Sequence, residues 1–425
     1  MLHQLLDITD ANRPNTLTKS MSQLSLSSDD SERVSVRSTL VSMSEATKTN
    51  NKHSREVVFE DVDPEDINFA LALGDREPET IECVRINRCR MDSAAFAALV
   101  DNMCQVDLCR LQILDIAQNS IGGELVGPAL LRLIRHARNI RHLALGWNKI
   151  ALADLVALAP ADGPNAAFSI SHLDLRANPL SRPVKSSSRR PSKSTSGAYA
   201  PTDLSWLPSL IAAMPKLTHI LLAQASLSDS DLVALIHALV PAIPPIEYIG
   251  LEWLGLGSRL SALSTILRDL SPKLTPSPLK LHLNLSANTL GDSGMRVISE
   301  STAKLSSLTL SCNFITERGT RYLAQWLPSS GVVDLDLSDN HFGDQGVAAL
   351  LSASTESVHD QADADLVIGG IRYSTQIKCL GLTSCCLSDT SLRMLTEALD
   401  GHWAPLSSLK ILRNSRISHG TKIAV

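Results

Sequence analysis

Aromatic residues are scarce in this chain. Phe, Trp and Tyr make up 4% of the 425 residues, whereas hydrophobic residues together reach 44%. A core must therefore be built mainly from Leu, Ile, Val and Ala. Long apolar runs are also missing, because prolines break stretches such as "DLVALIHALVPAIPPI" (231–246). A membrane-spanning helix needs about 20 apolar residues, so the sequence predicts no membrane insertion.

The chain also lacks a strong charge of either sign and the marks of secretion. A net charge of −5 gives no reason to expect nucleic acid or an anionic membrane as a partner. The opening residues, "MLHQLLDITDANRPN", contain neither a basic start nor an apolar run, so no signal peptide is expected. The eight cysteines include no Cys-x-x-Cys pair and no zinc-like spacing. We expect a reduced, cytoplasmic protein, with the nucleus as the second candidate location.

Signatures of catalysis are missing as well. The sequence contains no Ser-His-acid signature, no phosphate-binding loop and no paired-carboxylate motif. The glycines of "IGLEWLGLGSRL" (249–260) follow the spacing of a repeat rather than that of a phosphate loop. The sequence therefore predicts no enzyme, no cofactor and no metal site.

One short pattern, L-x-x-L-x-L-x-x-N-x-L, recurs along the chain. Clear copies are "LQILDIAQNSI" (111–121), "IRHLALGWNKI" (140–150), "ISHLDLRANPL" (170–180), "LSSLTLSCNFI" (305–315) and "VVDLDLSDNHF" (332–342). With weaker copies, the asparagine position falls at Cys89, Asn119, Asn148, Asn178, Ala225, Leu254, Asn288, Asn313, Asn340, Cys385 and Asn414. We expect its side-chain amide to satisfy backbone groups where each strand turns away.

Helical signals follow the copies. Stretches such as "GDSGMRVISE" (291–300) and "SDTSLRMLTEAL" (388–399) open with a Gly or capping residue and then place apolar residues at helical spacing. Units of about 28 residues, each with one short strand and one helix, are typical of leucine-rich repeats. The sequence therefore predicts an α/β fold, a right-handed solenoid (horseshoe) of about 11 ribonuclease-inhibitor-type leucine-rich repeats.

Other segments depart from the repeat. Residues 1–53 are rich in Ser and Thr and are expected to form a disordered tail. The repeat domain is expected over 67–420, with a basic, Ser-rich insertion at 181–202 and an acidic one at 354–373. In the first insertion, "SRRPSKS" places two arginines ahead of Ser192, as in basophilic kinase sites. Ser192 is thus a candidate phosphorylation site, and a merely solubilising linker is the alternative.

Side chains that alternate with the strand leucines are expected on the concave face. One column of them is His142, His172, His219, Tyr248 and His282. Because neighbouring strands lie about 4.8 Å apart, a stacked or hydrogen-bonded column is favoured over a metal site. Trp147 and Trp253 are candidate protein contacts, because Trp is enriched in hot spots, unless they pack at the turn. Asp334 and Asp336 form a candidate patch for a basic partner, against the alternative of solvated carboxylates.

The segment "SREVVFEDVDPED" (54–66) precedes the first repeat. In an extended chain Val57 and Phe59 point the same way while Val58 faces away, and Arg55 adds a positive charge ahead of them. Alternate side chains of this kind give specificity to a peptide that adds a strand to a partner's sheet. The competing interpretation is that "EVVF" pairs beside the first repeat and caps its core.

The spacing of Arg55, Val57 and Phe59 resembles the RVxF docking motif for the catalytic subunit of type-1 protein phosphatase. The order of the repeats, from "ISHLDLRANPL" to "IKCLGLTSCCLSD", is similar to that of the leucine-rich-repeat regulatory subunit of this phosphatase. The resemblance implies that Arg55, Val57 and Phe59 bind the phosphatase. It also implies that the protein catalyses nothing and that its concave face binds or occludes a second protein.

Two alternatives belong to other classes. A generic leucine-rich-repeat scaffold would use the same concave face without any phosphatase. A Ran-type GTPase-activating protein would share the repeat type, but such proteins typically carry an acidic tail, whereas this sequence ends in "TKIAV". No activating arginine is assigned.

Overall fold

A computed structural model describes residues 55–74, 77–159, 167–181, 203–240, 246–270, 281–351, 377–400 and 406–418. The tail at 1–53, the insertion at 354–373 and Ser192 lie outside these residues, so the predictions made for them stay predictions. Over the ranges that are described, none of the helices has the length and apolar character needed to cross a membrane.

A single parallel sheet runs through the described part of the chain, with its strands in sequence order. The strands are β1 (Glu56–Glu60), β2 (Cys83–Asn87), β3 (Ile113–Asp115), β4 (His142–Ala144), β5 (His172–Asp174), β6 (His219–Leu221), β7 (Tyr248–Gly250), β8 (His282–Asn284), β9 (Ser307–Thr309), β10 (Asp334–Asp336), β11 (Cys379–Gly381) and β12 (Ser408–Lys410). Each pairs in register with the next, so equivalent residues of successive repeats lie side by side and form columns. The predicted α/β solenoid of leucine-rich repeats is confirmed.

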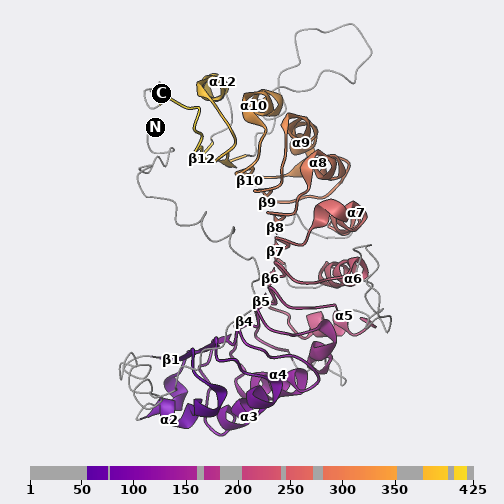
Figure 1. The fold of residues 1–425 in the computed structure, drawn as a ribbon. Helices are drawn as coiled ribbons and strands as arrows, with labels where there is room; N and C mark the ends of the chain where they lie inside the picture. The colour runs from indigo at the N-terminus through magenta and orange to yellow at the C-terminus, as the bar shows by residue number, and fades with distance from the viewer. Residues whose placement is uncertain are drawn as a thin grey trace, which may run out of the picture.

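Helical segments connect the strands and cover the outer side of the arc, while the strands line its inner side (Figure 1). The α-helices are α2 (Phe69–Leu73), α3 (Ser93–Met103), α4 (Val126–His136), α5 (Leu207–Ala212), α6 (Asp229–Leu239), α7 (Leu260–Asp269), α8 (Gly291–Ser299), α9 (Glu317–Ser330), α10 (Gly343–Leu351) and α12 (Asp389–Asp400). Short 3-10 helices are η2 (Pro64–Asp66), η3 (Pro78–Thr80), η4 (Leu152–Leu158) and η5 (Leu256–Ser258). The repeat that begins with β4 therefore uses η4 where the sequence predicted a full α-helix.

The core lies between the sheet and the helices. The central residue of each short strand is buried, as with Leu143, Leu173 and Leu308, and it packs against apolar residues of the helices such as Leu130 and Leu323. Several helices begin at a side-chain cap; the Asp92 carboxylate accepts a hydrogen bond from the backbone N–H of Ala95, which satisfies a donor that the first turn leaves open.

A ladder of asparagines stabilises the turns after β3, β4, β5, β8, β9, β10 and β12, as predicted. The Oδ1 atom of Asn313 accepts hydrogen bonds from the backbone N–H groups of Asn288 and Leu290, and its Nδ2 donates to three carbonyls. Where cysteine replaces asparagine, the thiol still donates; Cys385 Sγ lies 3.2 Å from the Leu337 carbonyl oxygen. Because buried backbone groups must be paired, this ladder fixes the path of the chain from sheet to helices.

The residue just before each ladder position is held in the left-handed backbone region. Its φ angle is between 52° and 61° in all eleven repeats, at Arg88, Gln118, Trp147, Ala177, Gln224, Trp253, Ala287, Cys312, Asp339, Ser384 and Arg413. Residues other than glycine rarely adopt this conformation. The consequence is that the side chains at this position form one further column, along the rim of the concave face.

The sheet begins one strand earlier than the predicted start of the repeat domain at residue 67. β1 pairs with β2 along its full length, with Val57 opposite Val84 and Phe59 opposite Ile86. Val57 is fully buried and Phe59 is 9% exposed. Residues 56–60 therefore belong to the sheet and close its N-terminal edge.

Candidate functional site

The docking segment predicted from the sequence is not presented to solvent. In this structure the two anchor side chains, Val57 and Phe59, lie inside the core, and Val58 between them faces away from it. Arg55 is exposed and pairs with Glu82, with 2.6 Å between Nη1 and Oε1. The prediction that these residues form an accessible docking peptide does not describe this state, because the apolar side chains that would bind a partner instead cap the first repeat.

Five aromatic side chains form the predicted column across β4–β8 of the concave face. The ring centroids of His142 and His172 lie 4.0 Å apart, and those of His172 and His219 lie 4.2 Å apart, with the rings nearly parallel. Tyr248 continues the stack at 5.8 Å from His219, and its ring meets His282 edge-on. The preferred stacked arrangement is therefore confirmed.

Hydroxyl groups set the orientation of two imidazoles in this column. Ser171 Oγ lies 2.9 Å from His172 Nδ1 and is also within hydrogen-bond distance of the carbonyl of Arg141. Thr218 Oγ1 lies 2.9 Å from His219 Nδ1 and is also within hydrogen-bond distance of the carbonyl of Ser171. Each hydroxyl therefore holds its ring in place through Nδ1, and the tautomer of the imidazole decides which of the two atoms donates.

Burial and neighbouring histidines favour the neutral form of three histidines in this column, His142, His172 and His282. Desolvation, followed by the nearby His142 and His219, lowers the pKa of His172 to about 4. Desolvation likewise lowers the pKa of His142 and of His282. No group of three or more metal-ligating side chains converges anywhere in the described residues. At neutral pH His142, His172 and His282 serve as hydrogen-bonding aromatic groups.

A polar network lies beside the stack at the centre of the sheet. Tyr248 Oη donates to Glu252 Oε1 at 3.1 Å, and Asn284 Nδ2 donates to the same oxygen and to Tyr248 Oη. The other carboxylate oxygen, Oε2, is buried without a hydrogen-bond partner among the described residues. This network was not predicted from the sequence, although alternation along and just beyond β7 places Tyr248, Gly250 and Glu252 on the same face.

Trp147 and Trp253 belong to the rim column described above, and both are exposed, by 51% and 57%. Their backbone N–H groups donate to the carbonyls of Arg176 and Ser286 in the next repeat, which holds the backbone while the indoles face solvent. The alternative that these residues pack at the turn is therefore wrong. Ala177 and Gln224 lie between them in the column.

Asp334 and Asp336 lie on the concave face of β10, where they line a hollow of about 260 Å³ with Thr309, Gly381 and Lys410. Asp336 accepts a hydrogen bond from the backbone N–H of Ser338 at 2.9 Å. A Cβ atom at Gly381 would overlap Asp336 Oδ1, so glycine at this position of β11 makes room for the carboxylate. The hollow was not predicted, and the glycine in a concave column was its one sequence signal.

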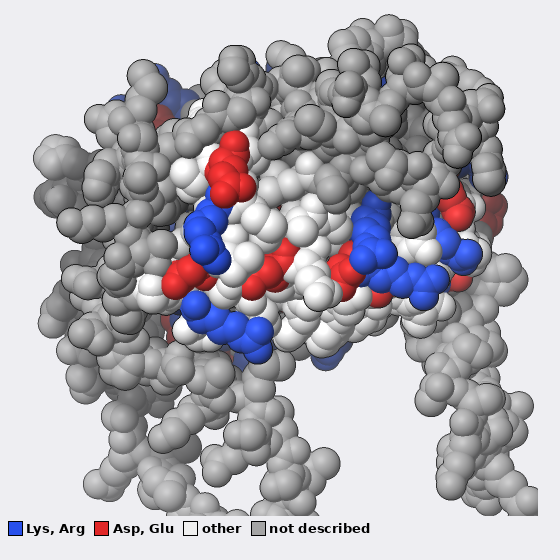
Figure 2. All heavy atoms as spheres, turned by 90° about the horizontal axis from the view of Figure 1, so that it is seen from above, with Lys and Arg blue, Asp and Glu red and all other residues white. Residues whose placement is uncertain are grey.

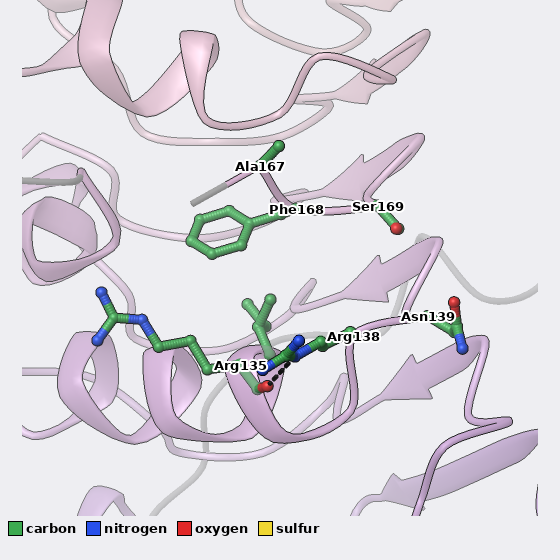
Figure 3. A pocket seen from close by; sticks show the side chains of 7 residues that line it. Arg135, Arg138, Asn139, Ala167, Phe168 and Ser169 are labelled. Carbon is green, nitrogen blue, oxygen red and sulfur yellow. Dashed lines mark hydrogen bonds between the residues drawn. The ribbon is translucent and has the colours of Figure 1, made fainter. Parts of the chain in front are cut away.

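A second hollow, of about 500 Å³, lies beyond the C-terminal end of α4 (Figure 3). Arg135 and Arg138 line one side of it and Phe168 the other, and Arg138 Nε donates to the Arg135 carbonyl at 3.3 Å. Cations at the end of a helix offset its negative dipole. These arginines therefore have a structural explanation, and the hollow is not our candidate site.

Comparison with known proteins agrees with this architecture. A family model described as "Leucine Rich repeat" matches residues 136–159, 281–299 and 332–351. The chain is 30% identical over 165 residues to "NACHT, LRR and PYD domains-containing protein 3" of Rattus norvegicus, and 31% identical over 140 residues to "Protein NLRC5" of Homo sapiens. These matches cover 38% and 30% of this chain but only 14% and 7% of the two relatives.

Two solved structures are similar to the chain at low sequence identity. An internalin (inlF) from Listeria monocytogenes has a TM-score of 0.40 and 16% identity, covering 86% of this chain and 83% of its own. The leucine-rich repeat-containing protein LegL7 from Legionella pneumophila has a TM-score of 0.39 and 13% identity, covering 66% of this chain and 90% of its own.

Proposed function

We propose that this leucine-rich-repeat protein is a non-catalytic interaction module that binds another protein on the concave face of β4–β10. Repeats of this kind are suited to protein–protein interaction, since their columns present a continuous surface. The observation that carries the proposal is the exposure of Trp147 and Trp253 at equivalent positions of two repeats.

The two tryptophans are placed as a pair of anchors. They are three strands apart, or roughly 14 Å at about 4.8 Å for each strand. Several concave positions between them carry small residues, Ala144, Gly146, Ala223 and Gly250, beside the column of stacked rings. At this position the backbone is in the left-handed region, which is strained for a bulky residue, and the exposed side chain gains no packing within the protein. Exposed Trp of this kind is the residue type most enriched in binding hot spots.

The test is a selection of binders from a displayed random-peptide library on the full-length protein. A Trp147→Ala/Trp253→Ala variant should bind the selected peptides about 30-fold more weakly, since hot-spot truncations cost about 2 kcal/mol or more. The matched control is Leu71→Ala/Leu125→Ala, which removes two exposed apolar side chains outside the concave face. Equal loss in both variants, or none in the first, would contradict the proposal.

Docking of type-1 protein phosphatase through Arg55, Val57 and Phe59 is the more specific function that the sequence suggests. It requires β1 to leave the sheet. Re-exposing the two apolar side chains costs about 1.5–3 kcal/mol each, and backbone bonds such as Glu82 N–H to the Arg55 carbonyl would also break. In its favour, β1 is an edge strand with one neighbour. This function is therefore our second candidate. No observation favours GTPase activation.

A further inference from the structure

Charge on the concave face is one-sided over eight consecutive strands. Three positions of each repeat face the concave side: the first and third residues of the strand and the second residue after it. In β3–β10 these positions hold five carboxylates and one guanidinium, which gives a net charge of −4 (one minus five). The charged residues are Asp115, Asp174, Glu252, Asp334, Asp336 and Arg176. The single cation is already paired, since Arg176 Nη2 lies 2.7 Å from Asp174 Oδ2.

The face seen from above in Figure 2 does not share this bias, because basic and acidic side chains of the described residues lie interspersed on it. At the N-terminal end of the sheet, Arg85 pairs with Glu56 at 2.8 Å and Arg88 pairs with Glu60 and Asp61. The unpaired excess of carboxylates therefore lies on β3–β10 rather than at the N-terminal end of the sheet.

The carboxylates of this face are hydrogen-bond acceptors only. One of them, Glu252, keeps its Oε2 atom buried without a hydrogen-bond partner among the described residues. A surface that presents mainly hydrogen-bond acceptors is matched by a partner that presents donors. Lysine and arginine are donor-only side chains, and their charged groups also bind over the face of Trp.

We infer that the partner proposed above contacts this face through a basic polypeptide segment, whose Lys and Arg side chains meet the carboxylates of β5–β10 between and beyond Trp147 and Trp253. The inference rests on the proposed function and adds the chemical class of the partner. The hollow at Asp334 and Asp336 is the place where one such cation fits, since it is open and is kept clear by Gly381, and its two carboxylates outnumber the one cation in its lining, Lys410.

The experiment uses the selected peptides and the full-length protein. Their affinities are measured for wild type, Asp334→Asn/Asp336→Asn and the tryptophan double variant, at low and at raised ionic strength. Asparagine keeps the shape of aspartate and the acceptor for Ser338 N–H, so the fold is retained. The matched control is Glu65→Gln/Asp66→Asn, which neutralises two exposed carboxylates in η2, outside the sheet.

Three outcomes separate the two claims. Peptides with net positive charge that bind about tenfold more weakly to Asp334→Asn/Asp336→Asn, and more weakly as salt rises, support the inference. Neutral or acidic peptides that lose affinity only in the tryptophan variant overturn the basic partner and leave the proposed function standing. Peptides that are unaffected by either variant, or no enrichment at all, overturn both.

Discussion

At the scale of single residues, the left-handed position before each asparagine is a cost that every repeat carries. The hydrogen bond from its N–H to the next repeat fixes its backbone, as from Trp253 to the Ser286 carbonyl. A residue at this position is therefore rigid at its backbone and free at its side chain. Trp147 and Trp253 use that rigidity to hold large apolar surfaces in solvent, which lowers the entropy lost when a partner binds.

The stacked histidines predict a pH dependence of stability. Burial lowers the pKa of His172 to about 4, while an unfolded histidine has a pKa of about 6.5. The unfolded chain therefore binds the proton more readily, so this contribution to stability is present above pH 6.5 and is lost as the pH falls toward 4. The free energy of unfolding, from urea titrations between pH 7 and 5, should fall less steeply in His172→Gln than in wild type. Identical slopes would show that the stack does not disfavour protonation.

At the scale of elements, β1 separates the two interpretations of residues 54–66. Val57 and Phe59 fill the core beside β2, so Val57→Ala/Phe59→Ala should lower the free energy of unfolding by about 4 kcal/mol. Val58→Ala, which changes the side chain on the opposite face of the same strand, should change it by less than about 1 kcal/mol. Denaturant titration of the three proteins measures both effects.

Calorimetry with the type-1 phosphatase catalytic subunit then tests docking itself. With β1 in the sheet, wild type is expected to give no binding through this segment. If wild type does bind, and a double variant that is still folded by circular dichroism does not, then β1 leaves the sheet and residues 54–66 are a docking peptide after all.

The sequence was a good guide to those elements that repeat. Strands β2–β12 and the asparagine ladder follow from one pattern, because each copy solves the same packing and hydrogen-bonding problem. The sequence could not show whether residues 56–60 form a strand of the sheet, since the alternation of Val57 and Phe59 fits a capping strand and a docking peptide equally. Nor could it separate η4 from an α-helix, or find the hollow at Gly381. Those features depend on contacts between neighbouring repeats rather than on the residues of a single repeat.

At the scale of the whole molecule, the in-order parallel sheet keeps each strand next to its sequence neighbours. Columns of equivalent side chains therefore run across many repeats without interruption (Figure 1). One column supplies the stacked histidines, another the exposed tryptophans, and the carboxylates lie between and beyond them. All of them lie on the inner side of the arc. We therefore propose that surface as the binding site, rather than the end strands β1 and β12.

Hydroxyl-radical footprinting of the full-length protein, with and without a saturating selected peptide, tests this most directly. The method reports the solvent exposure of individual side chains. We predict that oxidation of Trp147 and Trp253 falls several-fold on binding, because a hot-spot residue is desolvated in the complex, while Leu71 and Leu125 are unchanged. Unaltered oxidation of both tryptophans in a bound complex would contradict the account and place the interface elsewhere on the molecule.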